Sequence, residues 1–417
     1  MIRNSITIRR PERPIDVTLD LPRSKSVSNR ALILASLAGD LSCVKEISDG
    51  DDTRILHALL RDRPRVMHCG LGGTTLRFLM AWACVQEGEE HIITGDARLM
   101  ERPHKVLVDA LRSLGADIER TNDGFHVRGK KMKGGEITIE SPISSQFISA
   151  LLLIAPMMEQ GLTVRWTGRK LSEPYVGMTL KTLDHFGVEA AEHKAELYVL
   201  SSHQPRISPL EVPRDWSAAS FWYEVVALAP DARMVLNDLR MDGWQGDERA
   251  RKLWSFAVRS TDTNDGLLLD HPGHDQPPLG YLMTATPDLF LPLAFTYAGL
   301  GRIGLFGGIE NLPLKETDRL AAAKDALEKL GIAVEPREDT FGFSSSLGRP
   351  IPSSSDHLII SSSDQPFDPR GDHRMAMSLA PLALVCDAIT ILDPEVVNKS
   401  YPRFWDDLRK AGFRVER

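Results

Sequence analysis

The sequence has few cysteines, and their spacing matches neither a metal site nor a disulfide framework. The four cysteines, Cys43, Cys69, Cys84 and Cys386, are scattered along 417 residues. Such cysteines are typical of reduced core residues, which indicates a cytoplasmic protein.

Long apolar runs are also absent. No run approaches about 20 residues, the length that a membrane-spanning helix needs. Residues 1–21 are typical of polar strand sequence and not of a signal or transit peptide. We therefore expect no membrane association.

An excess of positive charge is missing as well. The formal net charge is -7, which argues against nucleic acid as the main partner. Lysines and arginines that cluster locally in such an acidic chain indicate an anion site instead. The length predicts about two domains, and the 42% apolar fraction supports full-sized cores.

One cationic, hydroxyl-rich turn stands out at residues 22–30. It reads Pro-Arg-Ser-Lys-Ser-Val-Ser-Asn-Arg and leads directly into the apolar run 31–38. A helix start exposes unpaired N–H groups, so Lys25, Ser26 and Arg30 suit a phosphate or carboxylate ligand there. The glycines of a Walker loop are missing, and a capped, solvated helix start is an equally good interpretation of this motif alone.

An internal repeat is visible in four segments that share an amphipathic helix, a glycine and a short strand. The glycines are Gly115, Gly187, Gly331 and Gly412, at intervals of 72, 144 and 81 residues. A glycine just past a helix takes the left-handed cap conformation at low cost. The doubled middle interval predicts a unit near residues 230–280 that has lost its glycine, and about six units in an α/β chain.

Several further helix starts carry polar or cationic side chains. Residues 70–77 are glycine-rich, Glu101-Arg102-Pro103 opens a helix, and Ser144-Ser145-Gln146 and the segment 172–175 open two more. Each could be a simple turn or cap. If the repeat units pack with their helices parallel, these N-termini converge on one anion-binding surface.

Candidate carboxylates come later in the chain. Asp288 precedes the apolar run 289–298, and the segment 314–320 packs Lys315, Glu316, Asp318 and Arg319 before a helix. These residues could equally be ordinary helix caps and a solvated first turn. Two further segments with charged residues precede expected helices, at residues 372–377 and 398–402. Residues 261–278 are polar and are expected to be irregular.

The order and content of these motifs resemble the 5-enolpyruvylshikimate-3-phosphate (EPSP) synthase family over nearly the whole chain. The strings at 24–30, 315–319 and 372–377 are the most specific. The other matching strings are Gly73-Thr74-Thr75-Leu76-Arg77, Glu101-Arg102-Pro103, Ser144-Ser145-Gln146-Phe147, Pro174-Tyr175, Asp215 to Ser220, Gln245-Gly246-Asp247, Pro287-Asp288 and Lys399-Ser400-Tyr401-Pro402.

The resemblance implies an α/β (α+β) fold, a two-domain inside-out barrel of six β-α-β-α-β-β units with three in each domain. One domain would be residues 19–216, and the other residues 1–18 and 217–417. The family places its ligands in the cleft between the domains, which close around them and exclude water. The resemblance also implies a monomer that needs no metal or organic cofactor.

The implied reaction transfers the enolpyruvyl group of phosphoenolpyruvate to the 5-hydroxyl of shikimate 3-phosphate and releases phosphate. By family match, Asp288 deprotonates the 5-hydroxyl, Glu316 protonates the methylene carbon, and Lys25 bridges both substrates. The implied shikimate 3-phosphate ligands are Lys25, Ser26, Arg30, Ser144, Ser145, Gln146, Ser172, Tyr175, Asp288, Asn311 and Lys315. The implied phosphoenolpyruvate ligands are Lys25, Gly73, Arg102, Gln146, Arg319, Arg374 and Lys399. In this family glyphosate occupies the phosphoenolpyruvate site, beside the glycine that Gly73 matches.

The chain departs from the family pattern in two places. Leu71 and Gly72 stand where the family usually has asparagine or aspartate and then alanine or serine, which removes a polar side chain beside the phosphoenolpyruvate phosphate. The segment 253–283 matches poorly.

Two alternatives to the implied activity remain. UDP-N-acetylglucosamine enolpyruvyl transferase shares the fold, but it has lysine-asparagine in place of Lys25-Ser26 and usually a loop cysteine, which residues 98–103 lack. A catalytically inactive anion-binding paralogue would be expected to lose a carboxylate or Lys25, yet Lys25, Asp288 and Glu316 are all present.

Overall fold

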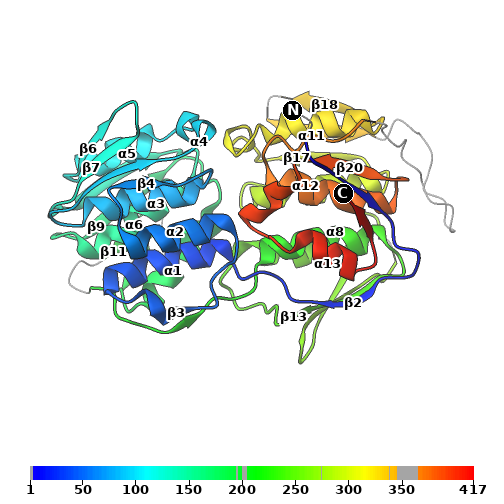
Figure 1. Ribbon diagram of the computed structural model, residues 1–417, viewed down its shortest axis with the longest axis horizontal. Coiled ribbons are helices and arrows are strands. Elements are labelled where there is room, and N and C mark those ends of the chain that lie inside the picture. The colour runs from blue at the N-terminus through cyan, green and yellow to red at the C-terminus, as the bar shows by residue number, and fades with distance from the viewer. Residues whose placement is uncertain (1–2, 194–195, 200–203, 274, 338, 345–364) are drawn as a thin grey trace. The chain divides into compact units, whose positions relative to one another are not determined.

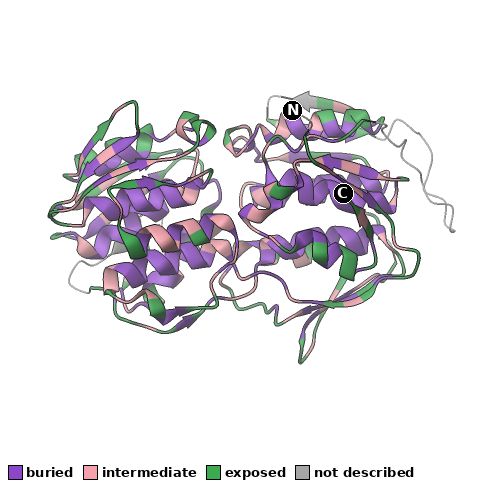
Figure 2. Ribbon diagram, in the orientation of Figure 1, coloured by how far each residue is buried: buried purple, intermediate pink, exposed green. Residues whose placement is uncertain are grey.

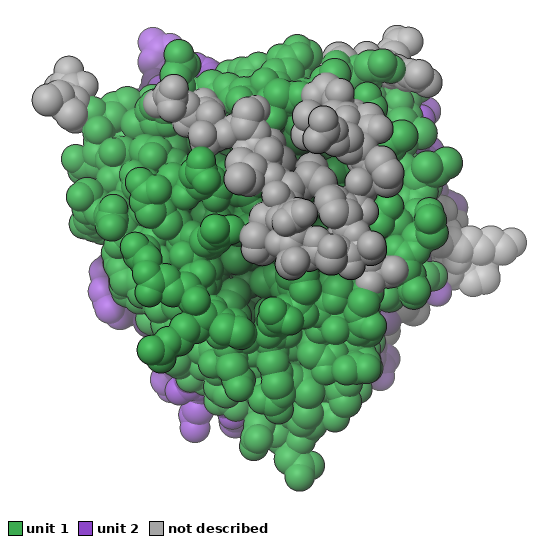
Figure 3. Space-filling model, turned by 90° about the vertical axis from the view of Figure 1, so that its right-hand side faces the viewer, with its two compact units in different colours: residues 1–22, 214–243, 247–417 green, residues 23–213, 244–246 purple. Residues whose placement is uncertain are grey.

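Residues 3–193, 196–199, 204–273, 275–337, 339–344 and 365–417 are described by the computed structural model of this chain. They divide into two compact units (Figure 3). Unit 1 comprises residues 1–22, 214–243 and 247–417, and unit 2 comprises residues 23–213 and 244–246. The chain therefore begins in unit 1, builds unit 2 and returns to complete unit 1.

Unit 2 alternates helices and short strands along its length (Figure 1). Its elements are α1 (Lys25–Ala38), η1 (Leu41–Cys43), β3 (Val44–Lys45), α2 (Asp51–Asp62), β4 (Val66–His68), α3 (Gly73–Cys84), β5 (Glu90–Thr94), α4 (Ala97–Glu101), α5 (Lys105–Ser113), β6 (Asp117–Arg120), β7 (Phe125–Arg128), β8 (Gly135–Glu140), α6 (Ser145–Ile154), η2 (Ala155–Met157), β9 (Leu162–Thr167), α7 (Glu173–His185), β10 (Ala190–His193), β11 (Glu196–Val199) and β12 (Leu210–Glu211).

Unit 1 contains both ends of the chain and has the same alternation. Its elements are β1 (Ser5–Arg9), β2 (Asp16–Leu19), α8 (Trp216–Leu228), β13 (Arg233–Asn237), η3 (Gly246–Arg249, whose first residue groups with unit 2), α9 (Ala250–Leu253), β14 (Arg259–Asp262), β15 (Gly266–Asp270), β16 (Gly280–Leu282), η4 (Pro287–Leu289), α10 (Phe290–Gly299), β17 (Gly304–Gly307), η5 (Leu312–Leu314), α11 (Arg319–Lys329), β18 (Ala333–Arg337), β19 (Thr340–Ser344), α12 (His373–Leu379), η6 (Ala380–Leu384), β20 (Ile389–Leu392), η7 (Pro394–Lys399), α13 (Phe404–Lys410) and β21 (Arg414–Glu416).

Four sheets share one strand order, which confirms internal repetition. The orders are β4-β5-β7-β6 and β8-β9-β11-β10 in unit 2, and β16-β17-β19-β18 and β2-β13-β15-β14 in unit 1. In each sheet the first two strands run parallel and the other pairs antiparallel. The remaining described sheets are smaller, with orders β20-β1-β21 and β12-β3.

The four repeat glycines occupy the predicted positions between a helix and a strand. Gly115, Gly187, Gly331 and Gly412 have φ values of 104°, 73°, 76° and 94°, in the left-handed region that favours glycine. The residue after each glycine donates its N–H to the carbonyl five residues before it, as in Val188 to Leu183, which caps the helix. The predicted unit without its glycine is also present, because α9 leads to β14 through the glycine-free segment 254–258.

The expectation that residues 261–278 are irregular is wrong for the first half of that segment. β14 and β15 form an antiparallel hairpin whose turn is closed by the Thr263 N–H donating to the Gly266 carbonyl at 2.8 Å. Leu267 and Leu269 alternate into the core of unit 1. Polar composition here marks the outer face of a strand, since only alternate residues of a half-buried strand need to be apolar.

Each unit is centred on helices that are buried on every side (Figure 2). In unit 2 these are α1, α3 and α6, and in unit 1 they are α8, α10 and α12. A helix that is buried all round belongs in a core. Its polar N-terminal end is then the part that can meet a ligand, and several candidate residues lie at these ends, among them Lys25 of α1, Gly73 of α3 and Ser145 of α6.

The described cysteines are buried and free, as expected from their spacing. Across the parts of the chain with described coordinates, no helix combines the length and apolar character needed to cross a membrane.

One buried residue, Glu224 of α8, leads to a stability prediction. Its side chain is 0% exposed, and neither carboxylate oxygen has a hydrogen-bond partner among the described residues. Burial raises the pKa of Glu224 well above its ordinary value of 4.5. The folded state therefore keeps a proton that the unfolded chain releases above about pH 4.5, so this group lowers stability as pH rises.

Glu224→Gln should remove that penalty. We expect a melting temperature close to wild type at pH 4.5 and several degrees higher at pH 8, since one pKa unit corresponds to about 1.4 kcal/mol. Thermal unfolding at both pH values measures the effect, with Glu395→Gln at an exposed position as the control. Equal differences at the two pH values would contradict the assignment of a neutral buried carboxyl group.

Candidate functional site

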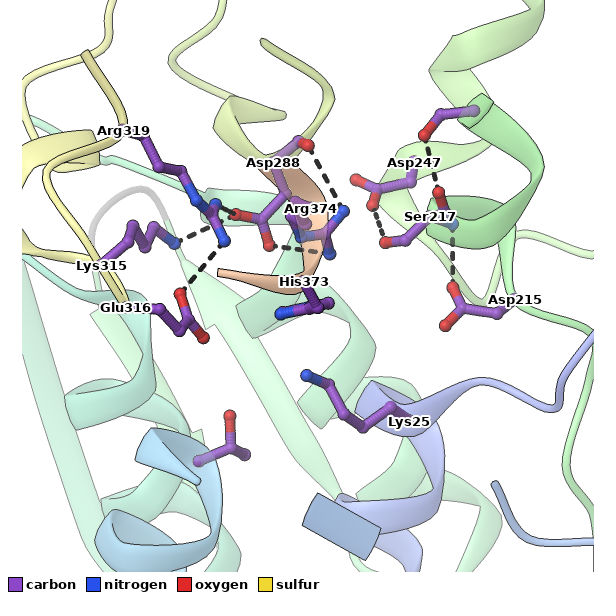
Figure 4. Close-up of polar contacts among 12 residues, drawn as sticks. Lys25, Asp215, Ser217, Asp247, Asp288, Lys315, Glu316, Arg319, His373 and Arg374 are labelled. Atoms are coloured by element: carbon purple, nitrogen blue, oxygen red, sulfur yellow. Dashed lines mark hydrogen bonds and ion pairs between the residues drawn. The ribbon is translucent and has the colours of Figure 1, made fainter. Parts of the chain in front are cut away.

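Unit 1 contains a dense group of charged side chains, which we call the unit 1 cluster (Figure 4). Its members come from η4 directly before α10, the segment that leads into α11, the start of α12 and the end of η7. They are Asp288, Lys315, Glu316, Arg319, Asp372, Arg374 and Lys399. Several helix starts thus supply charges to one place within unit 1, whereas convergence of the helix starts of unit 2 on one anion-binding surface stays a prediction.

Arg319 lies at the centre of the cluster and contacts three carboxylates. Its Nη1 donates to Asp288 at 2.8 Å, its Nη2 to Glu316 at 3.1 Å, and its Nε to Asp372 at 2.7 Å. Only 2% of its side chain is exposed. Burial alone would lower the pKa of Arg319, but Asp372, Glu316 and Asp288 raise it above its ordinary value, so the guanidinium stays charged.

Asp288 is surrounded by cations. Besides Arg319, Lys315 Nζ lies 3.2 Å from Oδ1 and Arg374 Nη2 lies 3.3 Å from Oδ2. Burial would raise the pKa of Asp288, but Arg374, Lys315 and Arg319 outweigh it and hold the pKa well below the ordinary range. Asp288 is therefore ionised at neutral pH and can accept a proton.

Glu316 is held by two cations at the other side of Arg319. Lys399 Nζ donates to its Oε1 at 2.9 Å, while Arg319 holds Oε2. The seven residues of the cluster thus include four cationic and three acidic side chains, and the four cations are donors for an anionic ligand. Bidentate guanidinium donors suit phosphate and carboxylate groups in particular.

Two further polar residues of unit 1 lie close to the cluster. Asn311 is buried at the start of η5, four residues before Lys315. Asp247 accepts a hydrogen bond from the Ser217 hydroxyl, and burial raises its pKa to about 6, against the opposing effect of Arg374. The sequence identified Asp247 only as part of a matching string, and nothing in that string signalled its burial.

In unit 2, Lys25 begins α1 and is paired with an acid that the sequence interpretation missed. Its Nζ lies 3.1 Å from Oδ2 of Asp52, whose side chain is 6% exposed. Asp52 is the second residue of α2, which Gly50 precedes without a side-chain cap. An acidic pair directly after a glycine at a helix start was the available signal.

A second group in unit 2 joins the starts of α3 and α6. Gln146 accepts a hydrogen bond from Arg77 Nη1 and donates to the Thr74 hydroxyl at 3.0 Å. A methyl group at Gly73 would lie 2.6 Å from Nη1 of Arg102 and 3.2 Å from Nη1 of Arg77. Gly73 therefore leaves the space that two guanidinium groups occupy.

The other predicted ligands of unit 2 lie at the starts of α1, α6 and α7. Ser144 caps α6, Ser145 follows it in a buried position, and Ser26 is the second residue of α1. Ser172 precedes α7 with a φ of 59°, an uncommon conformation for a residue other than glycine that is often found at functional sites. Tyr175 is half-buried in the first turn of α7.

Arg30 has a different environment from the one expected of a direct ligand. It is 1% exposed, and it donates to the Ser26 carbonyl at 2.8 Å, the Tyr175 carbonyl at 3.0 Å and the Thr179 hydroxyl at 2.7 Å. Burial lowers its pKa to about 10. These contacts tie the start of α1 to the start of α7, so Arg30 orients two predicted ligand segments.

The chemistry available in unit 1 is therefore proton transfer beside a cationic anion site. Two carboxylates, Asp288 and Glu316, are held by one guanidinium group and lie among lysines and arginines. Within the described ranges, no group of three or more His, Cys, Asp or Glu side chains is arranged to hold a metal ion.

Comparison with solved structures places the fold among enolpyruvyl transferases. The EPSP synthase from Acinetobacter baumannii is 22% identical, covers 99% of this chain and is itself covered completely, with a TM-score of 0.77. The enolpyruvyl transferase NikO from Streptomyces tendae is 15% identical, with a TM-score of 0.68. The match covers 100% of this chain and 99% of the NikO chain.

Sequence comparison is more specific. The family model described as EPSP synthase (3-phosphoshikimate 1-carboxyvinyltransferase) matches residues 60–408. The 3-phosphoshikimate 1-carboxyvinyltransferase of Bacteroides fragilis is 37% identical over 407 residues, covering 96% of this chain and 97% of the relative. That of Haemophilus influenzae is 33% identical over 437 residues, covering 96% and 97%. The chain belongs to the EPSP synthase family.

Proposed function

We propose that this chain transfers the enolpyruvyl group of phosphoenolpyruvate to the 5-hydroxyl of shikimate 3-phosphate, releasing phosphate, in the shikimate route to aromatic compounds. The observation that carries this proposal is the arrangement around Arg319, which holds an ionised Asp288 and Glu316 side by side within a cationic cluster. The family membership supplies the identity of the two substrates.

The reaction proceeds by addition and then elimination, and each step needs an acid and a base. Asp288 accepts the proton of the 5-hydroxyl, whose oxygen attacks the enol carbon of phosphoenolpyruvate. Glu316 takes a proton from Lys399, whose Nζ lies 2.9 Å from its Oε1, and gives a proton to the methylene carbon, which becomes a methyl group. The resulting tetrahedral ketal phosphate then loses phosphate while the methyl group returns a proton.

The cations stabilise the negative charges of both substrates. Arg319, Arg374 and Lys399 bind phosphoenolpyruvate from unit 1, and Lys25, Gly73, Arg102 and Gln146 bind it from unit 2. Shikimate 3-phosphate is bound by Ser26, Ser144, Ser145, Gln146, Ser172, Tyr175 and Lys25 of unit 2 and by Asp288, Asn311 and Lys315 of unit 1. Buried Arg30 supports these ligands by tying the start of α1 to the start of α7. In this proposal the substrates meet residues of both units in the cleft that the family uses.

The proposal extends to the repeat architecture and to the working form of the protein. The two smaller sheets represent reduced copies of the repeated unit, which gives six β-α-β-α-β-β units in an inside-out barrel with three in each domain. The parallel bridge from Phe367 to Ile391 beside β20-β1-β21 supports this, since it restores the fourth strand position. We propose a cytoplasmic monomer that binds no nucleic acid and needs no metal or organic cofactor; light scattering on a sizing column tests the mass.

The direct test is phosphate release from phosphoenolpyruvate with and without shikimate 3-phosphate. We expect release that depends fully on shikimate 3-phosphate and forms one enolpyruvyl ether for each phosphate. Release that depends on UDP-N-acetylglucosamine instead would identify the other transferase activity. The absence of release with either acceptor would indicate an inactive anion-binding paralogue.

Gly73→Ala should weaken glyphosate inhibition more than phosphoenolpyruvate binding. The added methyl group would lie 2.6 Å from Arg102 Nη1, so the guanidinium must shift, and glyphosate, whose phosphorus and carboxyl group are one bond further apart than those of phosphoenolpyruvate, has less room to follow. Overpacking costs about 1–3 kcal/mol, which corresponds to roughly a fivefold to 150-fold rise in the inhibition constant. Inhibition measured at several phosphoenolpyruvate concentrations tests this. An inhibition constant and a Michaelis constant that rise equally would show that Gly73 serves both ligands alike.

A further inference from the structure

Asp372 is fully buried and is held by donors on two different segments of unit 1. Its side chain is 0% exposed. Oδ2 accepts from Arg319 Nε at 2.7 Å, and Oδ1 accepts from Arg319 Nη2 at 3.4 Å. The same Oδ1 accepts the backbone N–H of Arg374 at 2.9 Å and so caps α12. A carboxylate with no exposed surface cannot contact a ligand directly.

The two arginines that Asp372 holds are the unit 1 guanidinium groups of the proposed phosphoenolpyruvate site. The contact to Arg319 is through its side chain, which fixes the plane of the guanidinium fork. The contact to Arg374 is through its backbone, which fixes the start of the helix from which that side chain extends. Both arginines in turn bond Asp288, at 2.8 Å for Arg319 and 3.3 Å for Arg374.

The backbone before Asp372 is shaped for this placement. Arg370 and Gly371 have φ values of 52° and 74°, and the Asp372 N–H donates to the Pro369 carbonyl at 2.9 Å. Two consecutive left-handed residues turn the chain sharply, so that the carboxylate enters the interior at the helix start.

We propose that Asp372 is a positioning residue for phosphoenolpyruvate, which sets the geometry of Arg319 and Arg374 together without touching substrate. The inference rests on the proposed roles of these two arginines. Losing Asp372 should therefore loosen the phosphoenolpyruvate site and leave the unit 2 ligands of shikimate 3-phosphate unaffected.

The test compares Asp372→Asn with wild type and with Asp318→Asn. Asparagine still caps α12 but offers no charge to Arg319. Asp318 is the matched control, because it caps α11 through the backbone N–H groups of Leu320 and Ala321 at 3.1 Å and 3.0 Å. We expect Asp372→Asn to raise KM for phosphoenolpyruvate at least tenfold, with an unchanged calorimetric Kd for shikimate 3-phosphate. Asp318→Asn should leave both values within twofold of wild type.

Asp372→Glu covers the case in which Asp372→Asn does not fold. It keeps the charge that buried Arg319 needs but shifts the carboxylate by one methylene, so it cannot serve both contacts in the same geometry. KM for phosphoenolpyruvate within twofold of wild type in either folded variant would overturn the proposal. So would an equal weakening of both substrates. An inactive wild-type enzyme would instead refute the proposed function.

Discussion

Asp288→Asn should lower turnover at least about a hundredfold, the usual loss for a catalytic base. Asparagine fills nearly the same volume but cannot take the proton of the 5-hydroxyl. Burial would raise the pKa of Asp288, but Arg374, Lys315 and Arg319 keep it well below the ordinary range, so the carboxylate is in the ionised form that the proposed role of base requires. Turnover is measured as phosphate release at saturating substrates.

The same variant should bind inorganic phosphate more tightly than wild type. In the described structure Asp288 occupies donors of Arg319 and Arg374 that an anion also needs. Removing its charge frees at least one charge-assisted hydrogen bond, worth about 1.5–3 kcal/mol, so we expect roughly tenfold tighter binding by calorimetry. Asp318→Asn is the control of equal charge change. Wild-type turnover would show that Asp288 is not the catalytic base. Weaker phosphate binding would show that Asp288 does not compete with an anion for the donors of Arg319 and Arg374.

Much of this architecture could be predicted from the sequence, because the signals are local. A glycine such as Gly187 or Gly331 marks the end of a helix by its own backbone conformation, whatever the rest of the chain does. Helix starts such as those at Lys25 and Arg319 are similarly marked by caps that precede a run of apolar residues. Local signals of this kind repeat along the chain, so the repeat itself was visible.

What the sequence did not predict depends on contacts between distant segments. Asp52 pairs with Lys25 across 27 positions, and Asp372 bonds Arg319 across 53. Neither spacing corresponds to a helix or strand period, so no pattern could assign the partners. Arg30 shows the converse case, where a motif predicts a ligand but burial by α7 makes the side chain an internal support.

The sequence did not predict the hairpin at residues 259–270 for another reason. Arg259, Asp262 and Asp270 give the segment a polar composition, yet Arg259 and Asp270 pair across the strands at 2.8 Å. Charges that pair across two strands stabilise a sheet surface, although in a linear sequence they resemble an irregular loop.

Glu316→Gln should lower turnover as much as Asp288→Asn does, but by blocking proton transfer to the methylene carbon and not from the 5-hydroxyl. Glu316 lies between Lys399 Nζ at 2.9 Å and Arg319 Nη2 at 3.1 Å, and glutamine keeps an acceptor for one of them. It cannot supply a proton to the methylene carbon. We expect turnover to fall at least about a hundredfold while shikimate 3-phosphate binding is retained.

Reaction in deuterium oxide separates the two roles. The wild-type enzyme should place solvent deuterium in the methylene group of the product and of recovered phosphoenolpyruvate, because the transient methyl group exchanges a hydrogen. Glu316→Gln should lose this incorporation in proportion to turnover. Glu310→Gln, at an acidic residue six positions earlier and outside the cluster, is the control and should keep it. Wild-type incorporation by Glu316→Gln would assign the methylene proton to another residue, and Lys25 would be the next candidate to replace.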